Sequence, residues 1–349
     1  MRTYCCILLL TVQAALGGES AETAVSKVVF VKGRELFDVS ADGTGLKQLT
    51  TDGVYKWLPK WAAGGGRIAY LVKSSGALAQ FELIAASGGT LTVFPIRPAE
   101  SHTGGMRSVE DLEWLDDAHV VIGGSANPWN CEQAVLDIKT GKEVEWHFGT
   151  CGTFVRSPDL KLVADWGPEG MGFSAKDRRE SLEVNGVNIY PATVSPQAAT
   201  LQFLSNPAWS PDSHQVALVD RDVKTGVTSL TVLDVRPDQA TGPERRSFGH
   251  VARPAPVLMH APLASDLDAE RMEVQWLNGF FVATAEGGEA LYQADPANRT
   301  IAPAGADAIR SVAARRTQAA QSKSRIDDLM RKLEGRQPDT LTAPVSSNQ

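Results

Sequence analysis

The stretch that decides the fold is NPAWSPDSHQVALVD, residues 206–220 of this 349-residue chain. Its Ser-Pro-Asp corner predicts a tight turn, because Pro211 presets φ and Asp212 can accept a hydrogen bond from the backbone two residues on. From Gln215 to Val219 the chain then places apolar residues on both faces of an expected strand. The stretch therefore predicts two short strands joined by a turn.

Fainter copies of this unit recur along the chain at an uneven spacing of about 40 to 65 residues. Each copy has a large anchor residue, a turn of small or acidic residues, and then a strand. The anchors are Trp61, Trp114, Arg156, Trp209 and Trp276. A second half-unit also repeats, as in ELFDVSADGTGLKQLT (35–50), where an Asp-Gly-rich turn joins two further strands. Four strands cannot bury both of their faces alone, so neighbouring units must stack.

The repeats predict an all-β fold over residues 18–304, a six-bladed β-propeller of four-stranded antiparallel blades followed by a C-terminal α-helix. We expect the anchors to be structural, packed between blades. The first unit has no anchor of its own, so its innermost strand must come from Ser20–Lys27 or from elsewhere. The expected blades are 26–50, 54–95, 106–150, 152–197, 202–250 and 266–304.

ELFDVSADGTGLKQLT and PAWSPDSHQVALVD resemble the WD-repeat-like propeller repeats of the TolB family of exported bacterial proteins. The repeats are also similar to those in the propellers of prolyl-oligopeptidase-like peptidases. The resemblance covers roughly residues 26–304 and implies a fold more than a function. The chain enters its first repeat without the separate α/β domain that precedes the TolB propeller. We expect no hydrolase domain of the peptidase kind either.

The N-terminus has the layout of a secretory signal peptide over residues 1–17. Arg2 precedes a short apolar run, and small residues follow it. A buried N-terminal strand is the alternative. A lipoprotein signal is less favoured, because Cys5 and Cys6 open the apolar run instead of following it. We expect a periplasmic or secreted protein without a membrane span.

Composition and motifs give no sign of catalysis. The 34 basic and 41 acidic residues give no reason to expect binding to nucleic acid. GFSAK around Ser174 lacks the second Gly of a hydrolase nucleophile elbow. His102, His250 and His260 have no ligand-spaced partners, so we interpret them as loop histidines. We assign no catalytic, cofactor-binding or metal-binding residue and expect no cofactor.

The C-terminal segment changes character and predicts a helix over 305–335, with a disordered tail over 336–349. An apolar stripe follows the helix at Ile309, Val312, Ala319, Ile326, Met330 and Leu333. The helix either docks on the propeller or contacts a partner. Because it lies outside the expected ring of blades, we expect its removal to change thermal stability little.

The favoured function is an exported, non-catalytic protein-binding or scaffold module of the cell envelope or exterior, with an unidentified protein partner. Long expected loops at 167–180 and 250–270 are candidate binding segments. The alternative is a carbohydrate-active propeller enzyme, a lyase or glycosidase, with residues gathered at the axial funnel. Carboxylates and histidines converging with shifted pKa values would favour the enzyme. Mixed polar residues would favour binding.

Cys131 and Cys151 remain after removal of the signal peptide, and we predict that they form one disulfide. The intervening residues turn back once, near Gly141, which can bring the two cysteines together. Closing a loop of this size would stabilise the fold by about 3 kcal/mol. Mass spectrometry of a non-reduced digest of exported protein should find the linked peptides. Alkylatable thiols at both positions would refute the bridge and leave two buried free cysteines.

Overall fold

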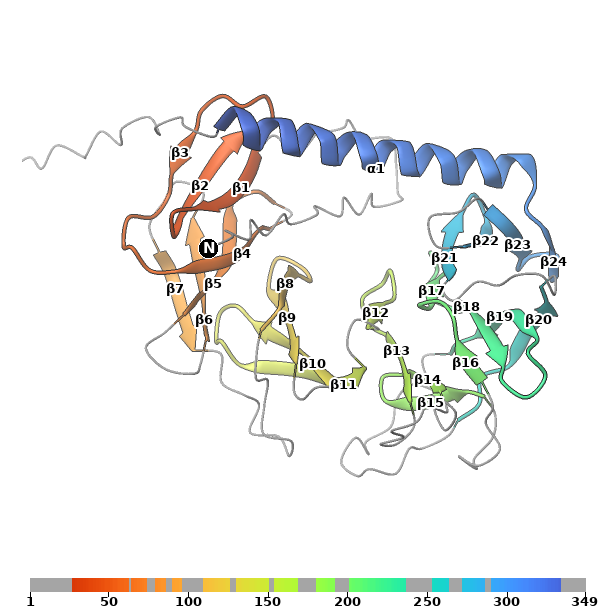
Figure 1. Cartoon of the computed structure of the whole chain (residues 1–349). Coiled ribbons are helices and arrows are strands. Elements are labelled where there is room, and N and C mark those ends of the chain that lie inside the picture. The colour runs from red at the N-terminus through yellow and green to blue at the C-terminus, as the bar shows by residue number, and fades with distance from the viewer. Residues whose placement is uncertain are drawn as a thin grey trace, which may run out of the picture. The chain divides into compact units, whose positions relative to one another are not determined.

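The computed structural model describes residues 27–62, 64–73, 79–85, 90–95, 109–125, 130–150, 154–168, 180–191, 201–236, 253–263, 272–285 and 290–333 (Figure 1). The chain forms two compact units. The first contains residues 1–126, 133–146 and 319–349, and the second contains residues 127–132 and 147–318.

The first unit holds three sheets, which we name A, B and C in chain order. Sheet A has the order β1-β2-β3, formed by Lys27–Lys32, Glu35–Ser40 and Lys47–Gln48. Sheet B has the order β4-β5-β6-β7, formed by Lys56–Trp61, Arg67–Lys73, Ala79–Ala85 and Thr90–Pro95. Sheet C has the order β11-β10-β9-β8, where β8 to β11 are Asp111–Trp114, His119–Ser125, Asn130–Asp137 and Glu143–Thr150. The ends of β10 and β11 extend into residues of the second unit.

The second unit holds sheets D, E and F. Sheet D has the order β12-β13-β14-β15, formed by Val155–Arg156, Val163–Pro168, Glu180–Val184 and Val187–Tyr190. Sheet E has the order β16-β18-β19-β20, formed by Leu201–Phe203, Gln215–Asp222, Thr228–Asp234 and Val257–Pro262, and β17 (Ala208–Trp209) also pairs with β18. Sheet F has the order β21-β22-β23-β24, formed by Met272–Leu277, Phe280–Ala285, Ala290–Asp295 and Thr300–Pro303.

The mostly β fold with a C-terminal helix and four-stranded sheets is confirmed. Every strand pair whose register is described is antiparallel. The predicted end of the fifth blade at residue 250 was wrong. The fourth strand of sheet E, β20, lies inside the stretch 250–270, which the sequence indicated as a loop. Pro262 inside it and Pro254 and Pro256 before it favoured a loop in the sequence, but Pro is tolerated in a strand at the edge of a sheet and β20 is such an edge.

Within each unit, neighbouring sheets pack face to face, and sheets B and E are each packed by a neighbouring sheet on both faces. Residues 216 and 218 of β18 belong to the core shared by sheets D and E, whereas residues 217 and 219 belong to the core shared by sheets E and F. In the first unit, separate cores join sheet A to sheet B and sheet B to sheet C. The strands are therefore apolar on both faces because each face is covered, as the sequence pattern of residues 215–219 requires.

The anchor residues occupy equivalent places in their sheets. Each one pairs across the strands with a residue of the next strand: Trp61 with Ile68, Trp114 with Val120, Arg156 with Val163, Trp209 with Val216, and Trp276 with Phe281. Two indole N–H groups also reach the preceding sheet. Trp114 donates to the carbonyl of Lys60 at 3.0 Å, and Trp209 donates to that of Val155 at 2.9 Å.

The Ser-Pro-Asp corner has a defined hydrogen-bond pattern. The Ser210 hydroxyl donates to Asp212 Oδ1 at 2.5 Å and accepts from the amide of Gln215 at 2.9 Å. Burial alone would raise the pKa of Asp212, but bonds from Ser210 and the His214 amide hold it below its ordinary value. The corner at Ser157 and Asp159 repeats this pattern, with 2.7 Å between the hydroxyl and Asp159 Oδ1. These residues shape turns and have no catalytic arrangement.

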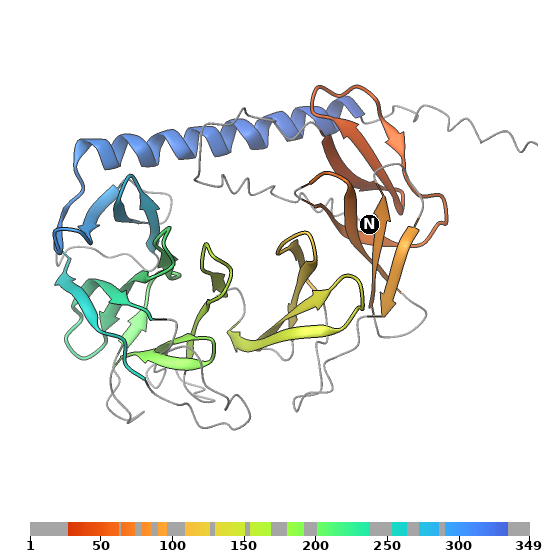
Figure 2. The same cartoon turned by 180° about the vertical axis from the view of Figure 1, so that it is seen from behind.

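Helix α1 (Ala306–Leu333) supplies residues to both units (Figures 1 and 2). In the second unit, Ala308 and Val312 are buried against sheet F. In the first unit, Leu329 and Leu333 are buried with the aromatic side chains of sheet A. In the described residues, no helix is long and apolar enough to cross a membrane.

The expected apolar stripe of α1 is partly correct. Val312 and Leu333 are buried, and Ile326 and Met330 are partly buried, but Ile309 and Ala319 are exposed. Ala308 and Leu329 are buried instead. A straight helix has 3.6 residues per turn, so its buried face shifts around the helix relative to a stripe of alternating steps of three and four residues. The expectation that the helix is dispensable does not fit this packing.

We therefore predict that shortening the buried side chains of α1 destabilises the protein. Leu329→Ala should lower the free energy of unfolding by about 2–5 kcal/mol, because it leaves a cavity in the core of sheet A. Ile309→Ala, on the same helix but 39% exposed, is the matched control and should change it by under about 1 kcal/mol. Urea unfolding followed by circular dichroism measures both. Equal effects would mean that α1 does not contribute to the core.

Candidate functional site

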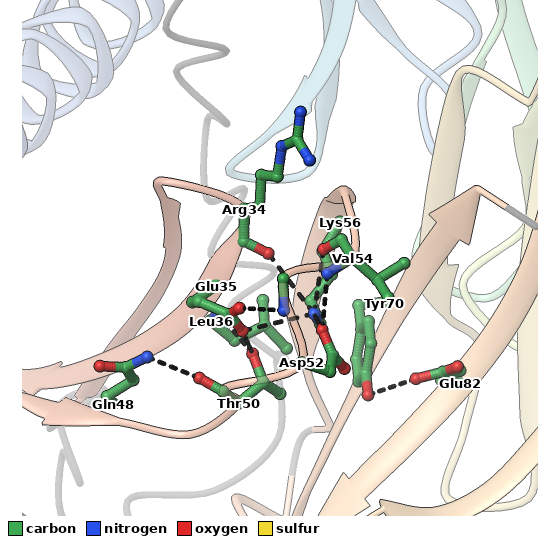
Figure 3. Close-up of polar contacts among 11 residues, drawn as sticks. Arg34, Glu35, Leu36, Gln48, Thr50, Asp52, Val54, Lys56, Tyr70 and Glu82 are labelled. Atoms are coloured by element: carbon green, nitrogen blue, oxygen red, sulfur yellow. Dashed lines mark hydrogen bonds and ion pairs between the residues drawn. The ribbon is translucent and has the colours of Figure 1, made fainter.

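The described interior contains two clusters of polar side chains, one in each unit. The first is centred on Lys56, whose side chain is fully buried at the start of β4 (Figure 3). Its ammonium group forms ion pairs with Asp52 and, at 3.5 Å, with Glu35. It also donates to the carbonyls of Val54 at 3.0 Å and Arg34 at 3.4 Å.

The remaining polar atoms of this first cluster are also paired. Glu35 accepts the Thr50 hydroxyl and the Gly53 amide, both at 2.5 Å, and Thr50 accepts the amide of Leu36 at 3.0 Å (Figure 3). Burial acts to raise the pKa of Asp52, but the bond and charge of Lys56 and the bond from the Val54 amide together hold it below its ordinary value. A buried charge with this many partners holds the segment between β3 and β4 against the β1–β2 hairpin. We interpret the cluster as structural.

The second cluster lines a cavity of about 370 Å³ in the second unit. The lining combines two carboxylates, an imidazole, hydroxyl groups and a few apolar side chains. Its residues are Tyr190, Leu201, Asp220, Asp222, Thr225, Val227, Ser229 and His260. They come from β15 of sheet D and from sheet E, so the cavity lies where these two sheets face one another.

The register of sheet E brings these side chains together. Val216 and Leu218 face sheet D, and with a period of two Asp220 and Asp222 continue the same face of β18. Ser229 pairs directly with Asp220, and Thr231 pairs with His260 on β20. The face that packs against sheet D is thus apolar along one part of β18 and polar at its end.

A chain of hydrogen bonds joins Asp220 to His260. The Thr231 Oγ1 lies 2.5 Å from Asp220 Oδ2 and 2.9 Å from His260 Nδ1. The Tyr190 hydroxyl donates to the same Asp220 oxygen at 3.4 Å. Thr231 has a single hydroxyl hydrogen, so donating it to Asp220 requires Thr231 to accept from His260. While Thr231 donates to Asp220, the hydrogen shared between Thr231 and His260 therefore belongs to His260 Nδ1.

Burial raises the pKa of Asp220 above its ordinary value of 3.8, against the hydrogen bond from Thr231 and the charge of His260, which act to lower it. Asp220 is 1% exposed. Burial, followed by the negative charge of Asp220, also raises the pKa of Tyr190 well above its ordinary value. The cavity thus holds a carboxyl group that takes up a proton more readily than an exposed aspartate does.

Asp220 departs from the repeat. It lies four residues after the residue that pairs with the anchor Trp209. The same count in the other sheets reaches Val72, Gly124, Gly167 and Ala285. Four copies place a small or apolar residue where sheet E places a buried carboxyl group. The departure is visible in the sequence once the five copies are aligned on their anchors.

The structure corrects the interpretation of His260 as a loop histidine, because it lies on β20 and contacts Thr231. Tyr190, Asp222 and Ser229 also line the cavity, and none of them was predicted as a site residue from the sequence. His102, His250, Ser174 and Cys151 lie outside the described residues, so the disulfide stays a prediction. Cys131 is buried in β10. In the described part of the chain, no three His, Cys, Asp or Glu side chains gather as metal ligands would.

No protein-family model matches the sequence. No curated protein matches it either.

Solved structures show distant similarity, and β-propellers are among them. The tricorn protease has a TM-score of 0.46 at 13% identity, over 80% of this chain and 29% of its own. The β-propeller domain of the Trilobed protease from Pyrococcus furiosus has a TM-score of 0.41 at 11% identity, over 79% of this chain and 80% of its own. A protein assigned as TolB, from Agrobacterium tumefaciens, has a TM-score of 0.31 at 13% identity, over 68% of this chain and 78% of its own. The chain is thus similar to propeller proteins, among them one TolB, at low identity.

Proposed function

We propose that this chain is an exported, six-bladed β-propeller that binds a protein partner without catalysing a reaction, and that the cavity of sheet E is its binding site. The six sheets in chain order, five of them with an equivalent anchor, support the assignment of blades. The signal-peptide pattern of residues 1–17 supports export to the periplasm or beyond.

The observation that carries this proposal is the polar lining of the cavity. A stack of sheets needs apolar residues between its members, and a carboxyl group there destabilises the stack unless its charge is compensated. Asp220 nevertheless replaces the small or apolar residue of the other copies, and Asp222, Ser229 and His260 surround the same space. Concave sites with a few convergent polar groups on a rigid scaffold are typical ligand sites.

The hydrogen-bond pattern favours binding over catalysis. Asp220 Oδ2 is occupied by Thr231 and Tyr190, and Thr231 itself is 0% exposed. A general acid must instead present its proton to the substrate. The hydrogen-bonded side chains of Asp220 and Thr231 are better suited to hold the wall of the cavity in place than to exchange protons with a substrate.

A carbohydrate-active enzyme is the second candidate, because Asp220 and Asp222 line one cavity and burial raises the pKa of Asp220. An acid of raised pKa beside a second carboxylate is the arrangement glycosidases use. Hydrolysis or elimination of an oligosaccharide by the wild type, lost in both Asp220→Asn and Asp222→Asn, would favour this candidate.

We predict that Asp222→Asn removes capture of a protein partner from envelope extract of the source cells. Asn keeps the acceptor that Asp222 Oδ1 offers to the amides of Lys224 and Thr225, at 2.8 and 3.0 Å, but not the charge. Asp137→Asn is the matched control, because Asp137 accepts in the same way from Lys139 and Thr140 and does not line the cavity. Quantitative mass spectrometry should find a partner that is retained by this control and reduced at least tenfold by Asp222→Asn. Equal retention by both variants would place the binding surface elsewhere.

The raised pKa of Asp220 predicts a specific pH dependence of stability. Its contribution is fully present below pH 3.8, the ordinary pKa, and is lost as the pH rises through the higher folded pKa. Each pH unit between the two pKa values corresponds to about 1.4 kcal/mol. Relative to Asp220→Asn, the wild type should therefore lose stability as the pH rises above about 4. Urea unfolding at a series of pH values measures the difference; a constant difference would mean that Asp220 titrates normally.

A further inference from the structure

Sheet A lacks, in the described residues, the kind of strand that holds an anchor in the other five sheets. We call that strand the anchor strand; it pairs with the strand that follows it, as β4 pairs with β5. β4 runs antiparallel to β5, so Lys56 at its start pairs with Val72 near the end of β5. In sheet A, β1 has the place of β5, and in the described residues it pairs with β2 alone. Its other edge presents backbone groups with which a further strand can pair.

Trp61 provides an independent indication that an anchor strand belongs at this edge. The indole of Trp114 donates to the carbonyl of Lys60, and the indole of Trp209 donates to that of Val155. Each acceptor is the residue just before the anchor of the preceding sheet. Trp61 follows sheet A, and its indole Nε1 is buried without a hydrogen bond in the described part of the chain. The carbonyl that completes the pattern would belong to an anchor strand of sheet A.

The end of α1 lies beside the end of β1 at which such a strand would begin (Figures 1 and 2). Lys32, the last residue of β1, donates from Nζ to the carbonyl of Leu333, the last residue of α1, at 3.3 Å. Leu333 is also buried in one cluster with Phe30 of β1. An anchor strand antiparallel to β1 would begin opposite Lys32, as β4 begins opposite the end of β5. The five residues 334–338 can span about 17 Å, which is ample for the step from α1 to this edge.

The sequence after these five residues has the pattern of a strand. It reads DTLTAPVS over residues 339–346, and the apolar residues Leu341, Ala343 and Val345 recur at every second position. This is the period of a strand with one apolar face. The β-branched threonines between them also favour a strand.

Pro344 determines how such a strand would face β1. A proline has no backbone N–H, so in a sheet it lies where no donor is needed, and β4 itself contains Pro59. The nitrogen of Pro344 would therefore point away from β1. Because successive backbone groups of a strand point to opposite sides, the amides of Ala343 and Val345 would face β1 and donate to it.

The segment before β1 is the other candidate for this position. Residues 18–23 read GESAET, with two acidic side chains and without a branched apolar or an aromatic residue. A strand with no apolar face gains little from packing against a neighbouring sheet. The pattern therefore favours the segment after α1 over the segment before β1.

We propose that residues 339–346 form the anchor strand of sheet A, antiparallel to β1, and that one of their carbonyls accepts the indole N–H of Trp61. The strand ties the two ends of the folded chain into one sheet. The disordered tail expected over residues 336–349 lies outside the described residues, and this inference replaces that expectation. It is independent of the proposed binding function.

Two matched variants of the full chain test the inference. In one, residues 339–346 are replaced by alternating Gly and Ser, and in the other, residues 18–25 are replaced in the same way. Hydrogen exchange followed by NMR measures the indole proton of Trp61, which is assigned by its absence from Trp61→Phe. We expect this proton to exchange at least tenfold faster than in the wild type in the first variant, and at the wild-type rate in the second.

The indole protons of Trp114 and Trp209 are internal controls, and unchanged exchange of both shows that the rest of the fold is retained. If the first variant unfolds, so that all three protons exchange faster, Ala343→Pro decides in the same way, because it removes one donor that faces β1. Unchanged exchange of Trp61 in the first variant and in Ala343→Pro would overturn the inference. Faster exchange only after replacement of residues 18–25 would identify the N-terminal segment as the strand. Slow exchange that is lost on dilution would identify the segment of a second copy. Either result would also overturn it.

Discussion

The coverage of both faces of sheets A, B, E and F is the constraint on which the structure depends. In β18, Val216 and Leu218 face sheet D, while Ala217 and Val219 face sheet F. A sheet built in this way cannot be stable with one face in water, since each exposed Val or Leu forfeits about 1.5–3 kcal/mol of burial. The same constraint explains the role of α1, whose buried residues cover a face of sheet A and a face of sheet F.

The anchors add a directional bond to this non-directional packing. Trp114 and Trp209 each donate to a carbonyl on the first strand of the preceding sheet. Trp61 follows sheet A, which has three strands in the described residues and no counterpart of β4 or β12 there. Its indole N–H is buried without a hydrogen bond in the described part of the chain. An unpaired buried donor costs about 1–3 kcal/mol. The junction of sheets A and B therefore lacks the stabilising bond that Trp114 and Trp209 each make to the sheet before them.

The repeats predicted most of the fold because apolar alternation and turn chemistry are local signals. The Ser-Pro-Asp corner at Ser210 and the anchors could be read directly from residue type and spacing. The strand at Val257–Pro262 could not, because its pairing with β19 is a long-range contact that overrides the turn propensity of Pro262 and of the prolines just before the strand. In α1, the pattern identified the helix, but which residues are buried depends on the sheets that it meets.

The candidate site was missed for a different reason. Asp220, Ser229 and His260 lie on three strands, and each is unremarkable in its own segment. Only the strand register brings them to one cavity, and only comparison with Val72 and Ala285 shows that a carboxyl group is unexpected there. An apolar residue at position 220 would remove the desolvation of a carboxylate from the interior, and the stack would be more stable for it. Local rules of stability are usually broken where a group is needed for function. The buried carboxyl group is therefore better explained by what enters the cavity than by what it contributes to the fold.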